Sequence, residues 1–393
     1  MRERAHEMLG LDGRLRHFMV DLDRLAACAD FVAAVIRETY PTLAVPPHAR
    51  WRHFVVAGRD QWAALAERAR WADPAAKARA AFDLVTVSVL LDAGAGPDWR
   101  YHDAATGRVA GRSEGLALAS FRMFEAGMFS ADARDPLRAD AARLAALTAD
   151  GFAAGFQASE DNPLPGIAGR AALIARLGAT VAANPAVFGN LDGPRPGGLF
   201  DHFAAMADGR RLSAPRMLEA LLIQLGPIWP GRIALAGLAL GDTWRHPAIR
   251  RHDATDGLVP FHKLSQWLAY SLIEPLQAAG IAVTDPDGLT GLAEYRNGGL
   301  FIDAGVLNLR DLDAASIAHP VESTLVVEWR ALTIALLDRI APLVRERLGV
   351  TPAEFPLPCV LEGGTWAAGR RLAQDKRRDG RPPIMVASDG TVF

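Results

Sequence analysis

The sequence predicts a mainly α-helical protein with a few short strands. Apolar residues recur every three or four positions along most of the chain, which is the spacing of one helix face. Strand-like alternation of apolar and polar residues is scarce. No G-x-G-x-x-G motif follows a predicted strand, and no G-x-x-x-x-G-K-[ST] motif occurs. The sequence therefore argues against the nucleotide-binding α/β folds.

The predicted helices cover most of the chain. Residues 21–39 repeat apolar side chains at helical spacing, and Pro41 ends that helix. Residues 60–92 contain two helices, which separate at Asp73–Pro74. The helical pattern returns in residues 114–128, 135–149, 166–183, 214–225, 260–279, 290–308 and 320–348.

The strand candidates are short. Alternation marks Arg50–Val56 and a C-terminal segment at Ile384–Val386. A turn at Ser388–Gly390 connects this second segment to Thr391–Phe393.

Gly- and Pro-rich composition predicts two loops, at Asp92–Gly107 and Asn190–Gly198. No repeat or long linker interrupts the chain, so we expect a single large helical unit over residues 1–393. Its internal division would give two lobes, 1–200 and 201–393, and the second would carry most of the candidate site residues.

Composition narrows the class of protein. Of the 393 residues, 50% are hydrophobic and 22% are charged, and the formal net charge is -2, so no basic excess indicates a nucleic-acid surface. Cys28 and Cys359 lack any metal-ligand spacing, so we expect no disulfide framework and no metal site. The first residues lack the apolar stretch of a signal peptide, and no apolar run reaches about 18 residues. We therefore expect a soluble, cytoplasmic protein that needs no cofactor.

The predicted helix at 260–279 has an unusual second face. Apolar side chains from Phe261 to Leu276 make a core stripe. Pro260 suits the first helical turn, because its missing N–H costs nothing there. Periodicity leaves two interpretations of the other face open: a solvated outer surface, or one wall of a polar pocket. That face carries an amine, an amide, a phenol and a carboxylate, at Lys263, Gln266, Tyr270 and Glu274.

The next predicted helix places three charges, Glu294, Arg296 and Asp303, in an otherwise apolar segment. Thr290 is its expected N-cap, and Gly298–Gly299 lets another backbone or a ligand come close. Buried charges are costly unless they are paired, so one interpretation pairs Arg296 with either carboxylate. In the other interpretation, one carboxylate is left for acid or base chemistry.

Other polar groups interrupt apolar or turn-rich segments. Glu328 and Arg330 lie in the helix predicted at 320–348, either as a paired surface set or as pocket residues. A Gly-Gly pair and Thr365 open a further helix, which would be an anion site or simply a tight turn. Pro46–Phe54 concentrates two arginines and two histidines. We do not expect a Ser-His-Asp triad on a G-x-S-x-G elbow, and neither cysteine lies in an activating context, so we expect carboxylate chemistry.

Five segments carry a specific family resemblance: PPHARWRHF, DGLVPFHKLSQWLAYSLIEPL, TGLAEYRNGGLFIDAGVL, EGGTWAAGR and PPIMVASDGTVF. They resemble segments of the uracil catabolism protein four family, long classed as a domain of unknown function. The resemblance covers essentially the whole chain. That family is associated with a non-reductive route of uracil degradation, so the resemblance implies a step in which a ribosyl-urea is broken into urea and a ribose moiety.

A more distant resemblance suggests the chemistry. VPFHKLSQWLAYSL is similar to the FYKRAQ stretch of the queuosine-salvage nucleotide N-glycosylases, and TGLAEYRNGG is similar to their FADYRVPQ motif at about the same separation. That family resembles helix–hairpin–helix DNA glycosylases in fold and cleaves an N-ribosidic bond. Glu294 replaces its Asp, and Asn297-Gly298-Gly299 replaces its Val-Pro-Gln, so a deazaguanine substrate is not implied. The positions carried over are Lys263, Gln266, Glu294, Tyr295 and Arg296, with Glu328 and Arg330 from an E-x-R match.

Together the resemblances imply an N-glycoside hydrolase for a ribosyl-urea-type compound or its 5′-phosphate. N-glycosidic cleavage passes through an oxocarbenium-like state, which a carboxylate stabilises while a donor assists the departing nitrogen. We expect that carboxylate to be Glu294 or Asp256, with Glu328 orienting a cation. Trp267 or Tyr270 would pack on the leaving group. The expected substrate-binding residues are His262, Lys263, Gln266, Trp267, Tyr295, Arg296 and Arg330.

Two other functions stay open at this point. One is an amidohydrolase or cyclic-ureide hydrolase of the same pathway, and the other is a non-enzymatic nucleotide-sensing or scaffold protein. In each case the expected partner is a small molecule, with no nucleic acid and no membrane.

Overall fold

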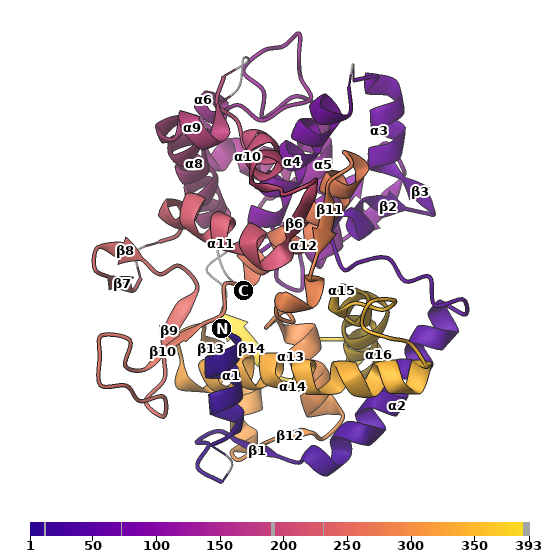
Figure 1. Ribbon diagram of the computed structural model, residues 1–393, viewed down its shortest axis with the longest axis vertical. Helices are drawn as coiled ribbons and strands as arrows, with labels where there is room; N and C mark the ends of the chain where they lie inside the picture. The colour runs from indigo at the N-terminus through magenta and orange to yellow at the C-terminus, as the bar shows by residue number, and fades with distance from the viewer. Residues whose placement is uncertain (12, 72, 190–192, 231, 388–393) are drawn as a thin grey trace. The chain divides into compact units, whose positions relative to one another are not determined.

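The computed structural model describes residues 1–11, 13–71, 73–189, 193–230 and 232–387. Helices dominate these residues, and the short strands within them join in pairs (Figure 1). The predicted mainly α fold is confirmed. Similarity in fold to the helix–hairpin–helix DNA glycosylases stays a prediction. Over the described ranges, no helix combines the length and the apolar character needed to cross a membrane.

The chain forms two compact units, and each combines segments that are far apart in sequence. Unit 1 contains Met1–His48, Ile233–Gln266 and Pro286–Ala387. Unit 2 contains, among the described residues, Ala49–Arg232 and Trp267–Asp285. The division of the chain into lobes at residue 200 stays a prediction.

The described part of unit 1 holds six complete helices and four strand pairs. The helices are α1 (Arg2–Leu9), α2 (Leu25–Thr39), α13 (Tyr295–Asp303), α14 (Thr324–Leu348), α15 (Leu357–Cys359) and α16 (Ala367–Lys376), with 3₁₀ turns at η1 (Leu22–Arg24), η4 (Pro286–Gly288) and η5 (Leu312–Ser316) and a π-helix at η6 (Val360–Trp366). The antiparallel pairs are β1 (Phe18–Val20) with β12 (Leu307–Leu309), β7 (Ala234–Leu235) with β8 (Leu238–Ala239) and β9 (Thr243–Arg245) with β10 (Leu258–Pro260), and the parallel pair is β13 (Ala318–Pro320) with β14 (Met385–Ala387).

Unit 2 is a set of helices with short strand pairs at its loops. The helices are α3 (Gln61–Ala69), α4 (Pro74–Leu90), α5 (Arg112–Glu125), α6 (Ala141–Ala145), α7 (Ala149–Gly155), α8 (Ile167–Ala183), α9 (Pro185–Phe188), α10 (Gly198–Met206) and α11 (Ala214–Gln224), with 3₁₀ turns at η2 (Arg50–Phe54) and η3 (Gly226–Ile228). The pairs are β2 (Val55–Val56) with β3 (Arg59–Asp60), β4 (Tyr101–Asp103) with β5 (Arg108–Ala110), both antiparallel, and β6 (Arg211–Ser213) with β11 (Ala282–Thr284), parallel. Helix α12 (Lys263–Ala278) begins in unit 1 and continues in unit 2.

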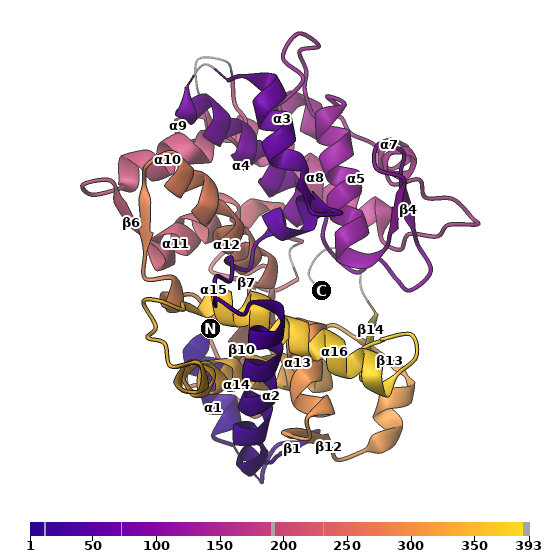
Figure 2. The same cartoon turned by 90° about the vertical axis from the view of Figure 1, so that its right-hand side faces the viewer.

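The core of unit 1 is built on α14. Its side chains are buried along most of its length, including Val326, Ile334 and Ile340. Ser323 Oγ accepts a hydrogen bond from Val326 N at 3.3 Å, and Gly349 ends the helix at a φ of 72°, which glycine adopts without strain. Helices α1, α2 and α13 pack on α14, and both views show α13 beside α16 (Figure 1, Figure 2).

The central helix of unit 2 is α4. Asp73 caps it by accepting from Ala76 N at 2.6 Å, and Pro74 occupies its first turn. From Ala80 to its end the helix is buried, and it packs against α5, α8 and α10 (Figure 2). The predicted break at Asp73–Pro74 is confirmed, because the cap and the proline together start a new helix.

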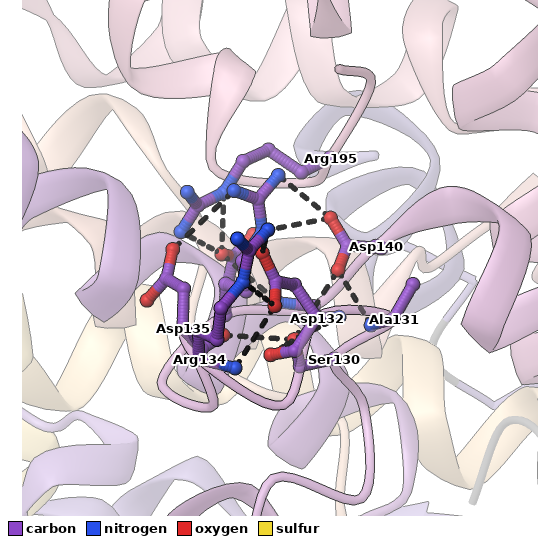
Figure 3. A network of polar contacts seen from close by, with 10 residues as sticks. Ser130, Ala131, Asp132, Arg134, Asp135, Asp140 and Arg195 are labelled. Atoms are coloured by element: carbon purple, nitrogen blue, oxygen red, sulfur yellow. Dashed lines mark hydrogen bonds and ion pairs between the residues drawn. The ribbon is translucent and has the colours of Figure 1, made fainter. Parts of the chain in front are cut away.

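A buried carboxylate on α4 organises the loop between α5 and α6. Asp83 accepts hydrogen bonds from Arg195 Nε at 2.7 Å and from Ala139 N at 3.1 Å. Asp140 accepts from Ala131 N at 2.7 Å in the same network (Figure 3). Burial raises the pKa of Asp83, and the Arg195 charge opposes that rise. These groups satisfy one another, so we assign the network a structural role.

Two segments start differently from the prediction. Pro260 does not enter the helix, because it ends β10 opposite Thr243, and α12 begins at Lys263. The predicted strand Arg50–Val56 is instead a 3₁₀ turn over Arg50–Phe54, with only two extended residues after it. In both places, hydrogen bonds to residues far away in the sequence determine the backbone conformation. The local sequence pattern alone does not determine it.

The helix predicted from residue 290 begins five residues later. Glu294, rather than Thr290, is the N-cap of α13. Thr290 Oγ1 instead accepts a hydrogen bond from Gln266 Nε2 at 2.7 Å. A tertiary contact to α12 therefore occupies the residue that the sequence assigned to the cap.

The remaining differences are smaller. The helix predicted at 135–149 is shorter, since α6 covers only Ala141–Ala145 and α7 starts again after a cap at Thr148. The C-terminal strand is confirmed as β14. The predicted turn at Ser388–Gly390, the segment Thr391–Phe393 and part of the loop Asn190–Gly198 lie outside the described residues.

Candidate active site

A buried ion pair fixes the start of α12 in unit 1. Asp242, just before β9, accepts from Arg330 Nη1 at 2.7 Å and from Arg330 Nη2 at 2.7 Å. It also accepts from Trp244 Nε1 at 2.8 Å and from Lys263 N at 2.9 Å. Burial disfavours the charged carboxylate, but the Arg330 charge and these hydrogen bonds outweigh burial and lower the pKa of Asp242 to about 2. The carboxylate is therefore ionised and fully engaged.

Arg330 connects three segments of unit 1. Its guanidinium carbon lies 4.2 Å from the centroid of the Phe261 ring, and its Nε donates to Ala293 O at 3.3 Å. With the Asp242 pair, these contacts place α14 against both the start of α12 and the residue before the α13 cap. Arg330 therefore acts as a brace for the segments that carry the candidate catalytic residues.

Glu294 is a buried carboxylate at the N-terminus of α13. Its Oε2 accepts from Arg296 N at 2.6 Å, and its Oε1 accepts from Asn297 N at 2.5 Å. The residue is 8% exposed. Burial raises the pKa of Glu294, while the two N–H groups and the charges of Lys263 and Arg296 oppose the rise. The helix N-terminus thus fixes a carboxyl group that takes up a proton more readily than an ordinary glutamate.

The start of α12 contributes one cation, Lys263, near this carboxylate. His262, directly before the helix, adopts a left-handed φ of 50°, which is strained for a residue with a side chain. Burial lowers the pKa of His262, and the Asp242 charge opposes that shift. A neutral imidazole at neutral pH follows. The charge of Lys263 acts on Glu294, so α12 and α13 bring a cation and a carboxylate together.

We call Asp242, His262, Lys263, Glu294 and Arg330 the Glu294 cluster. The sequence predicted four of these residues and missed Asp242. The signal for it was indirect: a buried arginine in an apolar helix requires a carboxylate partner, and nothing in local spacing says which one.

A second layer supports the helix start that holds Glu294. Thr365 Oγ1, in the π-helix η6, donates to Asn297 Oδ1 at 2.8 Å. Asn297 Nδ2 in turn donates to Leu292 O at 3.3 Å. Thr365 therefore lies inside the π-helix and does not open a helix, as the sequence indicated that it would. It holds the residue whose backbone N–H binds Glu294.

Other predicted binding residues also make hydrogen bonds or ring contacts within unit 1. Gln266 is buried and donates to Thr290, which joins α12 to the segment before α13. Arg296 Nη1 donates to Gly380 O at 2.8 Å, and its guanidinium carbon lies 5.0 Å from the centroid of the Tyr295 ring. The structure thus directs the charged end of Arg296 toward the C-terminal segment of unit 1.

The contacts of Glu328 are with residues outside the Glu294 cluster. Its carboxylate accepts hydrogen bonds from the backbone N–H groups of residues 16, 17 and 18, at 3.1, 2.9 and 2.9 Å. His246 Nε2 is 3.5 Å from its Oε2. Burial disfavours its charge, yet His246 and the backbone donors outweigh burial and lower the pKa of Glu328. In this position the carboxylate anchors the strand β1 segment.

Asp256 lies in the loop before β10, at the surface of unit 1. It accepts from Arg251 N at 2.6 Å and from Arg250 Nε at 3.2 Å. The Arg251 N–H is the main cause that lowers the pKa of Asp256. These contacts are those of a loop-stabilising carboxylate.

The rest of the polar α12 face belongs to unit 2. Trp267 faces His53, with ring centroids 6.0 Å apart. Tyr270 is fully buried, and Glu274 accepts from Arg52 Nη2 at 2.5 Å. Of the two interpretations of this face, the solvated outer surface is therefore wrong, because Gln266 and Tyr270 are buried.

Metal-binding residues do not gather in the part of the chain that the structure describes. Its His, Cys, Asp and Glu side chains form no group of three or more that would hold an ion. Arg330 and backbone N–H groups donate hydrogen bonds to the buried carboxylates of Asp242 and Glu294.

Comparison with known proteins places the whole chain in one family. A family model described as "Protein of unknown function (DUF1688)" matches residues 1–393. The protein named "Uracil catabolism protein 4" of Lachancea kluyveri is 40% identical to this chain over an alignment 414 residues long. The alignment covers 97% of this chain and 93% of that protein. "Protein urg3" of Schizosaccharomyces pombe is 39% identical over 389 residues, covering 96% and 92%. The family resemblance expected from the motifs is confirmed, and this chain belongs to the DUF1688 family.

Proposed function

We propose that this protein is an N-glycoside hydrolase of uracil catabolism. Its substrate would be a ribosyl-urea-type compound or the 5′-phosphate of that compound. The place in uracil catabolism rests on the name of the Lachancea kluyveri relative, which is 40% identical over almost the whole chain. The reaction type rests on the chemistry of the Glu294 cluster.

The observation that carries the reaction is the fixed, buried carboxylate of Glu294. Its two oxygens are held by backbone N–H groups at 2.6 and 2.5 Å. Cleavage of an N-glycosidic bond develops positive charge at the anomeric carbon, and a preorganised carboxylate stabilises that charge without reorganising. Because burial raises the pKa of Glu294, the group is also suited to exchange a proton with water during the reaction.

In the proposed reaction, water adds to the anomeric carbon as the bond from that carbon to the urea nitrogen breaks. The departing nitrogen takes up a proton from solvent, and the products are urea and ribose, or ribose 5-phosphate. Glu294 stabilises the oxocarbenium-like state, accepts the proton of the attacking water and then releases it to solvent. Lys263 and His262 bind phosphate or sugar hydroxyls beside it.

The other predicted residues have different roles in this proposal. Gln266, Trp267, Tyr295 and Arg296 stay proposed substrate-binding residues. Arg330 holds Asp242 and braces the site. Asp256 and Glu328 remain proposed alternatives for the carboxylate role, although Asp256 holds a surface loop and Glu328 anchors the β1 segment.

The test is a direct assay of the purified protein. Ribosyl-urea and its 5′-phosphate are each incubated with it, and both free urea and reducing sugar are measured. Glu294→Gln should lower turnover by about 10²-fold or more, since it removes the charge that stabilises the transition state. Glu322→Gln is the matched control, because Glu322 is an exposed glutamate of the same unit, and it should retain wild-type turnover.

The outcomes separate the three functions. Release of urea and sugar in equal amounts supports the glycosidase. Hydrolysis that needs an added metal ion, and stops with a chelator, supports the amidohydrolase. A folded protein that binds these compounds without turnover, with Glu294→Gln binding equally well, supports a sensing role and contradicts the proposal.

A further inference from the structure

Unit 2 contains a cavity of about 710 Å³ that the proposed reaction does not use. It is lined by residues of η2, α3, the start of α4 and the end of α12. A volume of this size lies within the range of small-molecule sites in proteins. The chemistry of its walls indicates what it would hold.

Three tryptophans form one wall of the cavity. Trp62 and Trp71 are stacked, with ring centroids 5.3 Å apart and 30° between their planes. Trp51 lies 5.4 Å from Trp62 and is fixed by a hydrogen bond from its Nε1 to Ser271 O at 2.7 Å. Trp62 and Trp71 are partly exposed. An indole array that ends at a partly exposed ring offers a stacking surface to another planar ring, such as a nucleobase.

The acidic groups that line the cavity are already engaged. Glu274 accepts from Arg52 Nη2 at 2.5 and 2.6 Å, so this pair carries no net charge. Asp60 caps α3 and Asp73 caps α4, each by accepting a backbone N–H. The helix N-termini therefore offset these two carboxylates.

Two cations remain beside the tryptophans. Arg70 and Lys77 both line the cavity and are exposed. Within the described ranges, neither side chain has a carboxylate at ion-pair distance. Positive charge next to an aromatic wall complements a ligand that joins a planar ring to an anionic group.

We propose that this cavity binds a nucleoside monophosphate. The base extends the indole stack at Trp71, and the phosphate pairs with Arg70 and Lys77. A free base would leave both cations without an anion, and a sugar phosphate would leave the indoles without a planar ring. The site goes beyond the proposed hydrolysis, since none of its lining residues belongs to the Glu294 cluster.

Calorimetric titration of the full chain with three probes tests the site. The first probe is uridine 5′-monophosphate, which carries both the base and the phosphate. The second is uridine, which has the base but no phosphate, and the third is ribose 5-phosphate, which has the phosphate but no base. The monophosphate should bind at least about tenfold more tightly than either part. Trp71→Leu should weaken the monophosphate and uridine by about tenfold or more but leave ribose 5-phosphate unchanged, and Trp71→Phe should retain most binding.

Removal of the cations gives the complementary result. Arg70→Gln and Lys77→Gln should each weaken the monophosphate and ribose 5-phosphate and reduce the salt dependence of binding, while uridine binding stays the same. Arg216→Gln is the matched control, because Arg216 is an exposed arginine of α11 outside the cavity. It should bind all three probes like the wild type.

Three results would overturn the proposal. One is no measurable binding of the monophosphate at millimolar concentration by a protein with wild-type circular dichroism. Another is wild-type affinity in Trp71→Leu, which would put any binding elsewhere in the chain. The third is equal affinity for the monophosphate and ribose 5-phosphate. None of these measurements involves ribosyl-urea, so their failure leaves the proposed hydrolase untouched.

Discussion

At the scale of single residues, Arg330 is a buried cation that depends on one partner. Its side chain is 1% exposed, and that of Asp242 is 3% exposed. Arg330→Met would leave the Asp242 carboxylate buried without its counter-charge. We therefore expect the free energy of unfolding to fall by about 3–5 kcal/mol, measured by urea denaturation at neutral pH.

A double variant is the control for this prediction. Arg330→Met combined with Asp242→Asn leaves no charge buried, so it should be more stable than Arg330→Met alone. If Arg330→Met unfolds at the wild-type urea concentration, the pair does not support the fold in this way.

The same carboxylate predicts a pH dependence. The pKa of Asp242 is about 2 in the folded protein, against about 3.9 for an unfolded aspartate. Because the folded pKa is the lower one, the stabilisation is fully present above about pH 4 and is lost as the pH falls toward about 2. This stabilisation amounts to about 2 kcal/mol.

The measurement is the difference in unfolding free energy between the wild type and Asp242→Asn along an acid titration. Other carboxylates titrate in both proteins, so the difference isolates Asp242. It should shrink by about 2 kcal/mol as the pH falls through this window. A difference that stays constant with pH would contradict the assignment.

At the scale of elements, α16 packs closely on the helix that begins at Glu294. A Cβ at Gly369 would lie 2.2 Å from Arg296 O, which is a backbone atom of α13. Gly369→Ala would therefore push the two helices apart, and we expect a loss of about 1–3 kcal/mol in unfolding free energy.

Gly151→Ala in α7 is the matched control for Gly369→Ala. Its Cβ would meet neighbours only at ordinary contact distance, 3.5 Å and beyond. Alanine is the better helix former, so this variant should be neutral or slightly stabilising in the same denaturation experiment. Equal losses in both variants would show that helix packing at Gly369 is not the cause.

A substitution in the π-helix η6 should affect the turnover of the proposed reaction. Thr365→Val removes the donor to Asn297 Oδ1 and so loosens the N–H group that holds Glu294. We expect about 1 kcal/mol of lost stability and, under the proposed function, about a tenfold lower kcat with KM little changed. Thr365→Ser keeps the hydroxyl and should restore kcat. Full activity in Thr365→Val would show that this layer does not position the carboxylate.

Periodicity predicted these elements better than it predicted their ends. The core stripe from Phe261 to Leu276 and the buried face of α14 follow directly from three- and four-residue spacing. The starts of α12 and α13 do not, because the β9–β10 pair and the Gln266–Thr290 contact decide them. The role of Asp242 could not be predicted from local spacing for the same reason, because its partner Arg330 lies 88 residues away in the sequence.

At the scale of the whole molecule, unit 1 is assembled from three distant segments. Helices α1 and α2 come from the first of them and pack on α14, which comes from the last. Glu328, which is 0% exposed, receives its hydrogen bonds from the N–H groups of residues 16–18. No linker or change in composition marks this interleaving, so the sequence could not reveal it.

The interleaving predicts how a fragment behaves. Residues 233–393 contain α14 but lack α1 and α2, so the fragment exposes apolar side chains of α14 and leaves Glu328 without its backbone donors. Expressed alone, it should bind a hydrophobic dye, lack near-ultraviolet circular dichroism and unfold without cooperativity. Adding residues 1–232 should restore a cooperative transition, because that fragment returns both the helices and the three N–H groups. Cooperative unfolding of 233–393 by itself would contradict this dependence and would mean that α14 can build its core without the N-terminal segment.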